Sequence, residues 1–158
     1  IEMIIRGFLL SRTKRTLKII SDTPNNAYMK RVKDLIGDSD NIMLLGPEYE
    51  QNKLIKLRCN AYAHIHGHSV GGTNPSLLEA MSAGAPIIAH DNIFNREVLS
   101  GGGFYFGSDF ELAKEIDKVE CLDKSVHDDF SALNRNRIQE YYNWERIFKL
   151  YLKTLLNE

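Results

Sequence analysis

Short apolar runs alternate with longer amphipathic or glycine-ended segments along most of this sequence. The apolar runs lie at 17–21, 41–46, 61–67, 86–90 and 103–107. The segments with helical features lie at 1–12, 26–37, 49–60, 74–84, 95–102 and 109–119. Strands that alternate with helices over short connections predict an α/β fold with a mostly parallel, Rossmann-like sheet flanked by helices. From about residue 125 the pattern is only helical, which predicts C-terminal helices.

Two of these segments have a clear inward face. In 1–12 the face carries Ile1, Ile4, Ile5, Phe8 and Leu9. In 49–60 it carries Leu54, Ile55 and Leu57. With 158 residues and no repeat, low-complexity tract or linker, the sequence predicts one domain over 1–158. It begins in helical rhythm without an initiator methionine, so we expect a fragment of a longer protein.

The charge balance argues against one class of partner. Lys+Arg 20 against Asp+Glu 21 gives a net charge of −1, whereas nucleic-acid-binding domains usually carry a basic excess. A local basic excess over 6–33 predicts a solvated basic face, with a surface for an anionic partner as the alternative. Its members are Arg6, Arg12, Lys14, Arg15, Lys18, Lys30, Arg31 and Lys33.

The cysteines and the hydropathy favour a cytoplasmic setting. Cys59 and Cys121 lack CxxC spacing, so neither a zinc site nor a disulfide framework is indicated. No apolar stretch approaches the roughly 20 residues that a membrane-spanning helix needs.

The stretch HGHSVGGTNPSLLEA, residues 66–80, carries the strongest functional signal. In open parallel sheets, ligands bind beyond the carboxyl ends of the strands, and this stretch leaves a predicted strand at that edge. One interpretation is a metal site, because His64, His66 and His68 would share one face of an extended strand. Further ligands are missing, since Asp91 and His127 are isolated candidates. Strand histidines without a metal are the alternative that we favour.

A phosphate-binding turn fits the same stretch better. Gly71 and Gly72 allow positive φ and a close approach of ligand to backbone. Asn74 is a good N-cap, and Pro75 suits the first helical position. The N–H groups and positive dipole end of the helix would favour a diphosphate. Neither GxGxxG nor GxxxxGK[ST] is present, so a tight turn that binds nothing stays the alternative.

Glu79 makes this prediction more specific. It lies just over one turn inside an otherwise apolar helix, and helical side chains lean toward the N-terminus. Its carboxylate can therefore face the ligand edge, where it would accept hydrogen bonds from a ribose diol. A phosphate-binding turn beside a diol acceptor predicts a nucleotide or nucleotide-sugar site. A solvated helix glutamate is the alternative.

Residues 71–99, GGTNPSLLEAMSAGAPIIAHDNIFNREVL, resemble the donor-binding segment of retaining GT-B glycosyltransferases of family 4. HGHSVGGTNPSLLEA is most similar to bacterial rhamnosyltransferases of capsule and surface polysaccharide synthesis. The final YNWERIFKLYLKTLL is similar to the helix that closes such enzymes. The resemblance covers nearly the whole chain as their C-terminal half, and implies that 1–158 is a nucleotide-sugar-binding domain within one half of a GT-B fold.

The resemblance also implies roles for particular residues. Glu79 would bind the donor ribose, and His68 would contact a phosphate or sugar hydroxyl at the mouth of the site. A loop beside the base would contain Gly46, Pro47 and Glu48. The diphosphate and sugar would lie against the backbone of Gly71, Gly72, Thr73, Asn74, Pro75, Ser76 and Leu77.

Two features depart from the family pattern. Gly71 occupies the position of the first glutamate of the family's EX7E pair, so no second carboxylate is assigned to the sugar. The usual basic GRxxxxK stretch has no counterpart here. The chemistry implied is retaining transfer from a nucleotide-diphosphate sugar, dTDP-rhamnose or similar, to a saccharide or lipid-linked acceptor bound by a missing N-terminal half. No metal or cofactor is predicted, no catalytic base is evident, and the fragment alone should be inactive.

Three alternatives to a soluble transferase stay open. The same fold serves sugar-nucleotide epimerases, which would need more carboxylates than Glu79, Asp91 and Glu97 near the edge. A non-catalytic nucleotide-binding module is the second. The third concerns location only, since the whole protein could associate peripherally with the inner face of the membrane.

Overall fold

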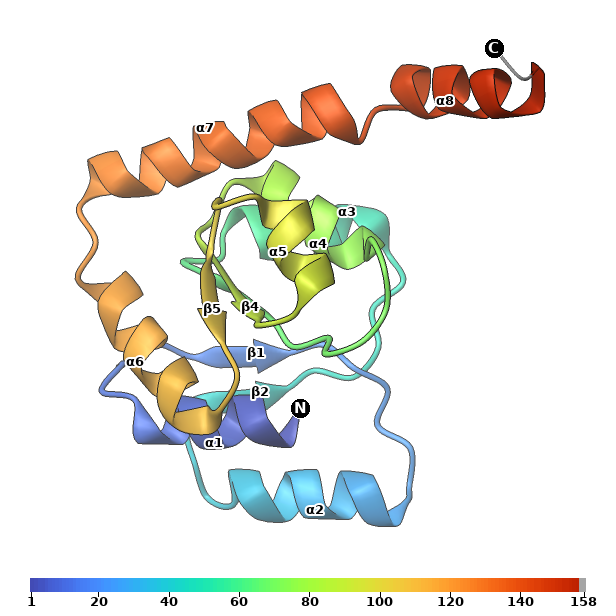
Figure 1. Cartoon of the computed structure of the whole chain (residues 1–158). Coiled ribbons are helices and arrows are strands. Elements are labelled where there is room, and N and C mark those ends of the chain that lie inside the picture. Colours follow the sequence, from blue (N-terminus) through green and yellow to red (C-terminus); the bar gives the residue numbers. More distant parts are fainter. Residues whose placement is uncertain (157–158) are drawn as a thin grey trace.

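The computed structural model describes residues 1–156, and helices and strands alternate along it as the sequence predicts (Figure 1). The strands are β1 (Leu17–Ile19), β2 (Ile42–Leu44), β3 (His64–His66), β4 (Ile87–His90) and β5 (Phe104–Phe106). The first six helices are α1 (Glu2–Leu10), α2 (Ala27–Ile36), α3 (Gln51–Cys59), α4 (Pro75–Ala83), α5 (Ile93–Leu99) and α6 (Asp109–Glu120). Two C-terminal helices follow, α7 (Lys124–Tyr141) and α8 (Trp144–Leu156).

All strand pairs are parallel, but they form two sheets. β1 pairs with β2, with Leu17 opposite Ile42. The second sheet has the order β3-β4-β5, with His64 opposite Ile87 and Ile88 opposite Phe104. The parallel α/β prediction is therefore confirmed, whereas the division into two sheets was not expected from the sequence.

Two apolar clusters form the core. The larger joins both sheets to α1, α2 and α6, and it includes Ile5, Val32, Ile42, Ile88 and Leu112. The smaller lies between α4, α5 and β4, and partly buried residues of α7 pack against it. Its buried members are Leu77, Ala80, Met81, Ile87, Ala89, Val98 and Leu99. Both clusters hold the strands against helices. The loops at the carboxyl ends of the strands therefore begin from elements that are packed in the core.

Most positions of the first helix that were predicted to face inward are buried or half-buried. The prediction was wrong for two residues, one on this helix and one on α3. Leu9 is exposed, because α1 buries Ile5 and Phe8 against α6 and the next position on the helix turns outward. Ile55 is exposed as well, while Leu54 and Leu57 on the same helix are half-buried. α3 has no fully buried residue, so it lies at the margin of the fold and needs only a narrow apolar stripe.

The two C-terminal helices differ in how they contact the rest of the chain. α7 packs along α4, and Ile138 of α7 and Tyr142, the residue that follows this helix, contact the smaller cluster. α8 extends away from the body in Figure 1, and none of its 13 residues is buried. Its exposed apolar side chains include Trp144, Phe148 and Leu155. Residues 1–156 include no helix with the length and apolarity that a membrane crossing requires.

Candidate functional site

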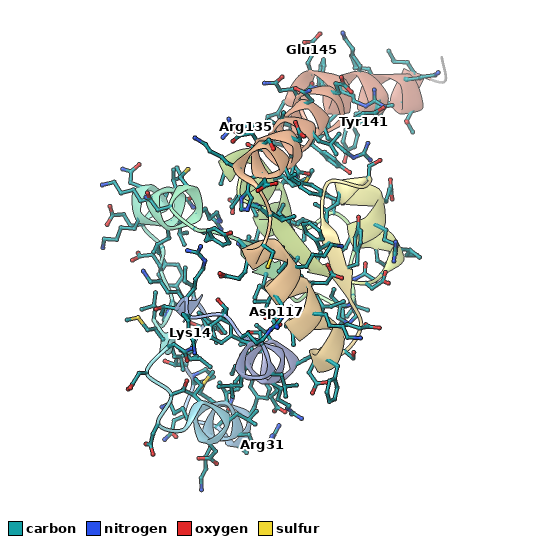
Figure 2. All side chains as sticks on the ribbon, turned by 90° about the vertical axis from the view of Figure 1, so that its left-hand side faces the viewer. Lys14, Arg31, Asp117, Arg135, Tyr141 and Glu145 are labelled. Atoms are coloured by element: carbon teal, nitrogen blue, oxygen red, sulfur yellow. The ribbon has the colours of Figure 1, made fainter. Side chains whose placement is uncertain are left out.

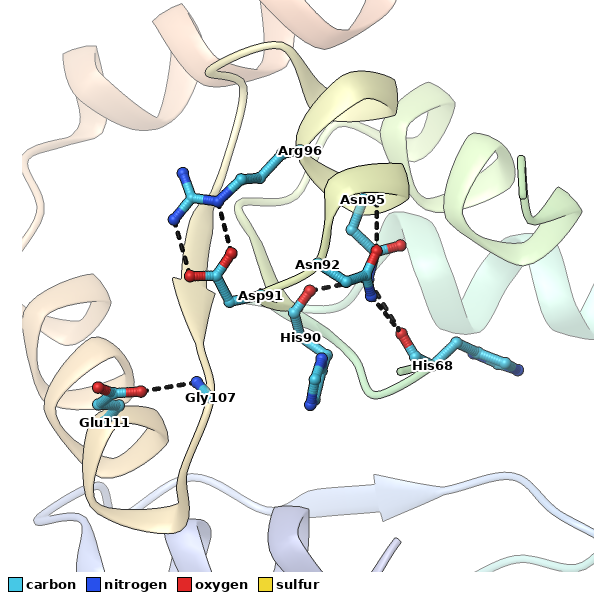
Figure 3. A network of polar contacts seen from close by, with 8 residues as sticks. All are labelled: His68, His90, Asp91, Asn92, Asn95, Arg96, Gly107 and Glu111. Carbon is cyan, nitrogen blue, oxygen red and sulfur yellow. Dashed lines mark hydrogen bonds and ion pairs between the residues drawn. The ribbon is translucent and has the colours of Figure 1, made fainter. Parts of the chain in front are cut away.

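The loops that follow β3 and β4 are joined by one buried asparagine. The Asn95 Nδ2 group donates to the carbonyl oxygens of His68 at 3.0 Å and His90 at 2.8 Å. Asn92 Nδ2 donates to the same His68 carbonyl at 3.0 Å, and its Oδ1 accepts from the Asn95 N–H. Figure 3 shows these contacts converging at the start of α5. The backbone at His68 is therefore fixed where the loop leaves the sheet.

The loop itself is open to solvent at its glycines. Gly71 has φ of 110°, which favours glycine. A Cβ at Gly71 or Gly72 would meet nothing within 4 Å, so the backbone there is accessible to a ligand from outside. Within residues 1–156, the N–H groups of Gly71, Gly72, Thr73 and Asn74 have no protein acceptor.

The first turn of α4 satisfies most of its own N–H groups. Asn74 Oδ1 accepts from the Ser76 N–H at 3.0 Å and from Ser76 Oγ at 2.8 Å. The Asn74 carbonyl accepts from Leu77 at 3.0 Å, and Pro75 has no N–H to offer. The N-cap predicted from the sequence is confirmed. The N–H groups of Ser76 and Leu77 are therefore already used within the helix start. An anion would find free N–H donors in the loop before α4 instead.

Glu79 has a partner that the sequence did not indicate. Its Oε2 atom lies 2.7 Å from Nη2 of Arg58, which comes from the last turn of α3. The Arg58 side chain is only 16% exposed, whereas that of Glu79 is 47% exposed. One carboxylate oxygen is thus held by a mostly buried guanidinium, and the group still reaches solvent. This geometry suits a carboxylate that accepts hydrogen bonds from a ligand.

The three histidines follow one another on the same side of β3 and the loop after it. The rings of His66 and His68 stack with centroids 4.7 Å apart, and those of His64 and His66 lie 6.4 Å apart. Burial lowers the pKa of His66 to about 4, with smaller contributions from His68 and His64. Burial and then the charge of Arg58 lower the pKa of His64 to about 4.

Stacked rings do not converge on a shared ion. Within residues 1–156, no group of three or more His, Cys, Asp or Glu side chains is arranged to hold a metal. Asp91 instead pairs with Arg96, whose hydrogen bonds lower the pKa of that carboxyl. His127 packs its ring against Tyr62, with centroids 5.1 Å apart.

The loop expected beside the base follows β2. Gly46 has φ of 73° and lines a hollow of about 510 Å³ between α2 and β2. Other residues of the hollow include Thr23, Lys33 and Leu44. The Glu48 carboxylate accepts from the Glu50 N–H at 2.9 Å, which lowers the pKa of Glu48, and Pro47 is exposed. Glu48 therefore orders its own loop.

Half of the basic residues between 6 and 33 are used within the fold. Arg12 pairs with Asp117 at 2.9 Å and Arg15 with Glu120 at 2.7 Å, so both fasten the start of β1 to α6. Arg6 and Arg31 both pair with Glu2. Figure 2 shows Lys14 and Arg31 on the part of the molecule that α1 and α2 form, away from α7 and α8. These ion pairs favour the solvated basic face over an anion-binding surface.

Solved structures share this arrangement. No protein-family model and no curated protein sequence matches the chain. The structure is similar to HepE from Anabaena in complex with UDP, with a TM-score of 0.83 and 19% identity over 99% of this chain and 44% of that one. It is also similar to sucrose-phosphate synthase from Thermosynechococcus elongatus, with a TM-score of 0.80, 17% identity and coverage of 99% and 43%. A third similar structure is WaaG, a glycosyltransferase involved in lipopolysaccharide biosynthesis (TM-score 0.69, 15% identity, coverage 86% and 38%).

These likenesses establish the fold, which is one half of the GT-B fold. The chain spans less than half the length of each of these proteins. The site residues predicted from the loop and α4 are continuous in sequence and lie at one end of β3. Arg58, Asn92 and Asn95 were missed, because each contributes through a partner distant in the sequence.

Proposed function

We propose that this chain is the donor-binding half of a glycosyltransferase that uses a nucleotide-diphosphate sugar. The observation that carries the proposal is the combination of the open N–H groups at 71–74, directly before α4, with the accessible carboxylate of Glu79, the fifth residue of that helix. The loop would bind the diphosphate, and Glu79 would accept hydrogen bonds from the sugar ring of the nucleoside. His68 lies beside this loop with an exposed side chain, where it can reach a phosphate or a hydroxyl.

The chemistry asked of these groups is stabilisation of a leaving group. As the glycosidic bond to the donor breaks, negative charge develops on the diphosphate. Oriented N–H donors stabilise that charge without reorganising, which lowers the barrier. Removal of a single donor of this kind typically costs about 100-fold or more in rate. Within residues 1–156 no side chain is assigned as base or nucleophile, so the acceptor and its activation belong to the other half of the protein.

The donor is proposed from two lines of support. The motif at 66–80 is similar to rhamnosyltransferases, which points to dTDP-rhamnose. HepE, of similar fold, has been solved with UDP and with UDP-glucose. The two donors differ in the nucleoside sugar that Glu79 would contact. The ribose of UDP offers two ring hydroxyls, whereas the deoxyribose of dTDP offers one. Glu79 as a diol acceptor favours a UDP sugar by the worth of one hydrogen bond to a charged group, roughly 1.5–3 kcal/mol.

The whole reaction is proposed as retaining transfer to a saccharide or lipid-linked acceptor in bacterial surface polysaccharide synthesis. Closure of the two halves would orient the reactants. Such an acceptor would bring the protein to the inner face of the membrane as a peripheral protein. An epimerase is disfavoured, because the Asp91 carboxylate is already engaged by Arg96.

The test is donor binding by the whole protein and by its Glu79→Gln variant. Thermal shifts with UDP, dTDP and GDP sugars should reveal one preferred donor, because stabilisation grows with ligand concentration over Kd. We expect Glu79→Gln to weaken that donor about tenfold or more in calorimetry. Glu140→Gln, on an exposed position of α7, is the matched control and should bind normally. Unchanged donor affinity in Glu79→Gln would remove Glu79 from the site.

A further inference from the structure

One peptide group in the loop after β3 is held on one side and free on the other. Its carbonyl is that of His68, which accepts from Nδ2 of Asn92 at 3.0 Å and from Nδ2 of Asn95 at 3.0 Å. Its N–H is that of Ser69, an exposed residue, and this N–H has no acceptor within residues 1–156. The carbonyl of this peptide is thus engaged twice, whereas its N–H is left for a ligand.

The planarity of the peptide sets the direction of that N–H. Within residues 1–156 no peptide bond is cis. A trans peptide is planar, and its C=O and N–H point in opposite directions. The His68 carbonyl points toward the start of α5, where Figure 3 shows Asn92 and Asn95. The Ser69 N–H therefore points away from α5, and a ligand on that side of the loop would meet it.

Asn95 ties this peptide to the sheet. Its side chain is buried, and Nδ2 also donates to the carbonyl of His90, the last residue of β4, at 2.8 Å. The Asn95 N–H donates to Oδ1 of Asn92 at 2.9 Å, so the two asparagines are held relative to each other. A buried amide with these bonds has little freedom to turn. The carbonyl of His68 is consequently fixed relative to the ends of both strands.

The other free N–H groups of the loop lack this support. Within residues 1–156, no carbonyl of residues 69–73 accepts a hydrogen bond, so the peptides that carry the N–H groups of residues 70–74 are not held from behind. Hydrogen bonds to a carbonyl also polarise its peptide and strengthen the N–H as a donor. Ser69 therefore offers a stronger and better oriented donor than the glycines that follow it.

We propose that the Ser69 N–H is a further donor to the diphosphate of the nucleotide sugar, and that Asn92 and Asn95 are positioning residues for it. This inference rests on the proposed function. Negative charge develops on the diphosphate as the bond to the sugar breaks, and a donor that is already oriented stabilises this charge without reorganising. Neither asparagine touches the donor in this arrangement, because both act through the His68 carbonyl.

The test is nuclear magnetic resonance of the full-length protein, labelled with nitrogen-15 in serine and glycine and titrated with UDP and then with dTDP. Loss of one signal in Ser69→Ala assigns the Ser69 amide. We expect the Ser69 amide proton to move downfield as the nucleotide binds, together with the amide protons of Gly71 and Gly72. A merely structural role of the asparagines would not produce this movement of the Ser69 signal.

Two variants test the asparagines. Asn92→Ser keeps a good N-cap for α5 and adds no charge, but it loses the donor to the His68 carbonyl. We expect nucleotide affinity to fall roughly threefold to tenfold, which corresponds to one hydrogen bond. Asn95→Ala should weaken binding further. Asn143→Ser is the matched control, because Asn143 also accepts from an N–H of the helix that follows it and donates to a backbone carbonyl, at the start of α8.

The outcomes separate this inference from the proposed function. Movement of the Gly71 and Gly72 signals with a stationary Ser69 signal would keep the proposed function and overturn the role of Ser69. Equal nucleotide affinities in Asn92→Ser, Asn95→Ala and the parent protein would overturn the positioning role, and so would an equal loss in Asn143→Ser. If neither nucleotide moves any of the three signals, the proposed function is rejected and this inference with it.

Discussion

Two imidazole nitrogens at the carboxyl ends of neighbouring strands are buried without a partner. They are Nε2 of His66 on β3 and Nδ1 of His90 on β4, and neither has a hydrogen bond within residues 1–156. A buried polar atom without a partner costs about 1–3 kcal/mol. A neutral imidazole can either donate or accept, so a ligand hydroxyl at this edge could satisfy it in either tautomer. Such unpaired groups are more easily explained at a binding site than in a structural turn.

The same burial predicts a pH dependence of stability. The pKa of His66 and of His64 falls to about 4 in the fold from an ordinary value of 6.5. As the pH falls, the unfolded chain therefore takes up protons first. Stability should be complete above about pH 6.5 and decline toward pH 4, by about 1.4 kcal/mol for each unit of pKa depression.

Urea unfolding between pH 7.5 and 4.5 checks this. We expect the decline to be smaller in His66→Gln, which cannot titrate, and unchanged in the control Asn136→Ala, an exposed position of α7 that carries no titratable group. Equal pH profiles for His66→Gln and the parent protein would show that His66 titrates normally.

Arg58 is expected to affect donor binding more than stability. Its partner Glu79 is half-exposed, so the ion pair contributes at most about 1 kcal/mol to folding. Arg58→Gln would release the Glu79 carboxylate from one fixed orientation, and we expect donor affinity to fall about threefold to tenfold. Calorimetry with the preferred donor measures this affinity. Lys149→Gln removes an exposed ion pair with Glu145 on α8 and should leave the donor affinity unchanged. Equal affinities in the two variants would contradict a positioning role.

Whether a site residue could be predicted from the sequence depends on how far it lies from its partner along the chain. Gly71, Gly72, Asn74 and Glu79 lie within nine positions, so local rules for turns and helix starts identify them together. Asn95 reaches His68 across 27 positions, and no local pattern indicates that contact.

At the scale of elements, the start of α4 is fixed by a single side chain. Asn74 Oδ1 holds both polar hydrogens that Ser76 offers. We expect Asn74→Ala to lower the free energy of unfolding by about 1 kcal/mol, which is the typical cost of a lost N-cap. Chemical denaturation measures this. Asn136→Ala, at an exposed position within α7, should change stability by less than half as much. Similar losses in the two variants would show that the cap does not stabilise α4.

Helices and strands were predictable from periodicity, but their arrangement was only partly so. The helix at 74–84 has a cap, a proline and a terminal glycine, and the structure places α4 within it. Ile55 was expected to face inward together with Leu54 and Leu57, yet the apolar contact of α3 is too narrow to reach it. The split into two sheets depends on which strand edges meet, and hydrophobic periodicity carries no information about that.

For the whole molecule, stability should be concentrated away from the last helix. Phe106 is 1% exposed at the centre of the larger cluster, whereas Phe148 on α8 is 63% exposed. In the 158-residue chain we expect Phe106→Ala to cost about 3–5 kcal/mol and Phe148→Ala about 0.5 kcal/mol or less. Urea midpoints of the two variants provide the comparison. A large loss for Phe148→Ala would mean that α8 packs against the body in solution.

The position of α7 has a consequence for the order in which the chain can mature on the ribosome. Asn134 donates to the Gly102 carbonyl, and Arg137 donates to the carbonyls of Val98 and Glu97. Those carbonyls end α5 and the turn after it, about 30 to 40 positions before their partners are made. The 32 to 40 positions that separate each carbonyl from its donor take about 2–8 s to synthesise at about 5–20 residues per second. During that interval α7 does not yet cover the smaller cluster, so its apolar side chains are exposed. A nascent chain that stalls before residue 134 should therefore be a substrate for chaperones.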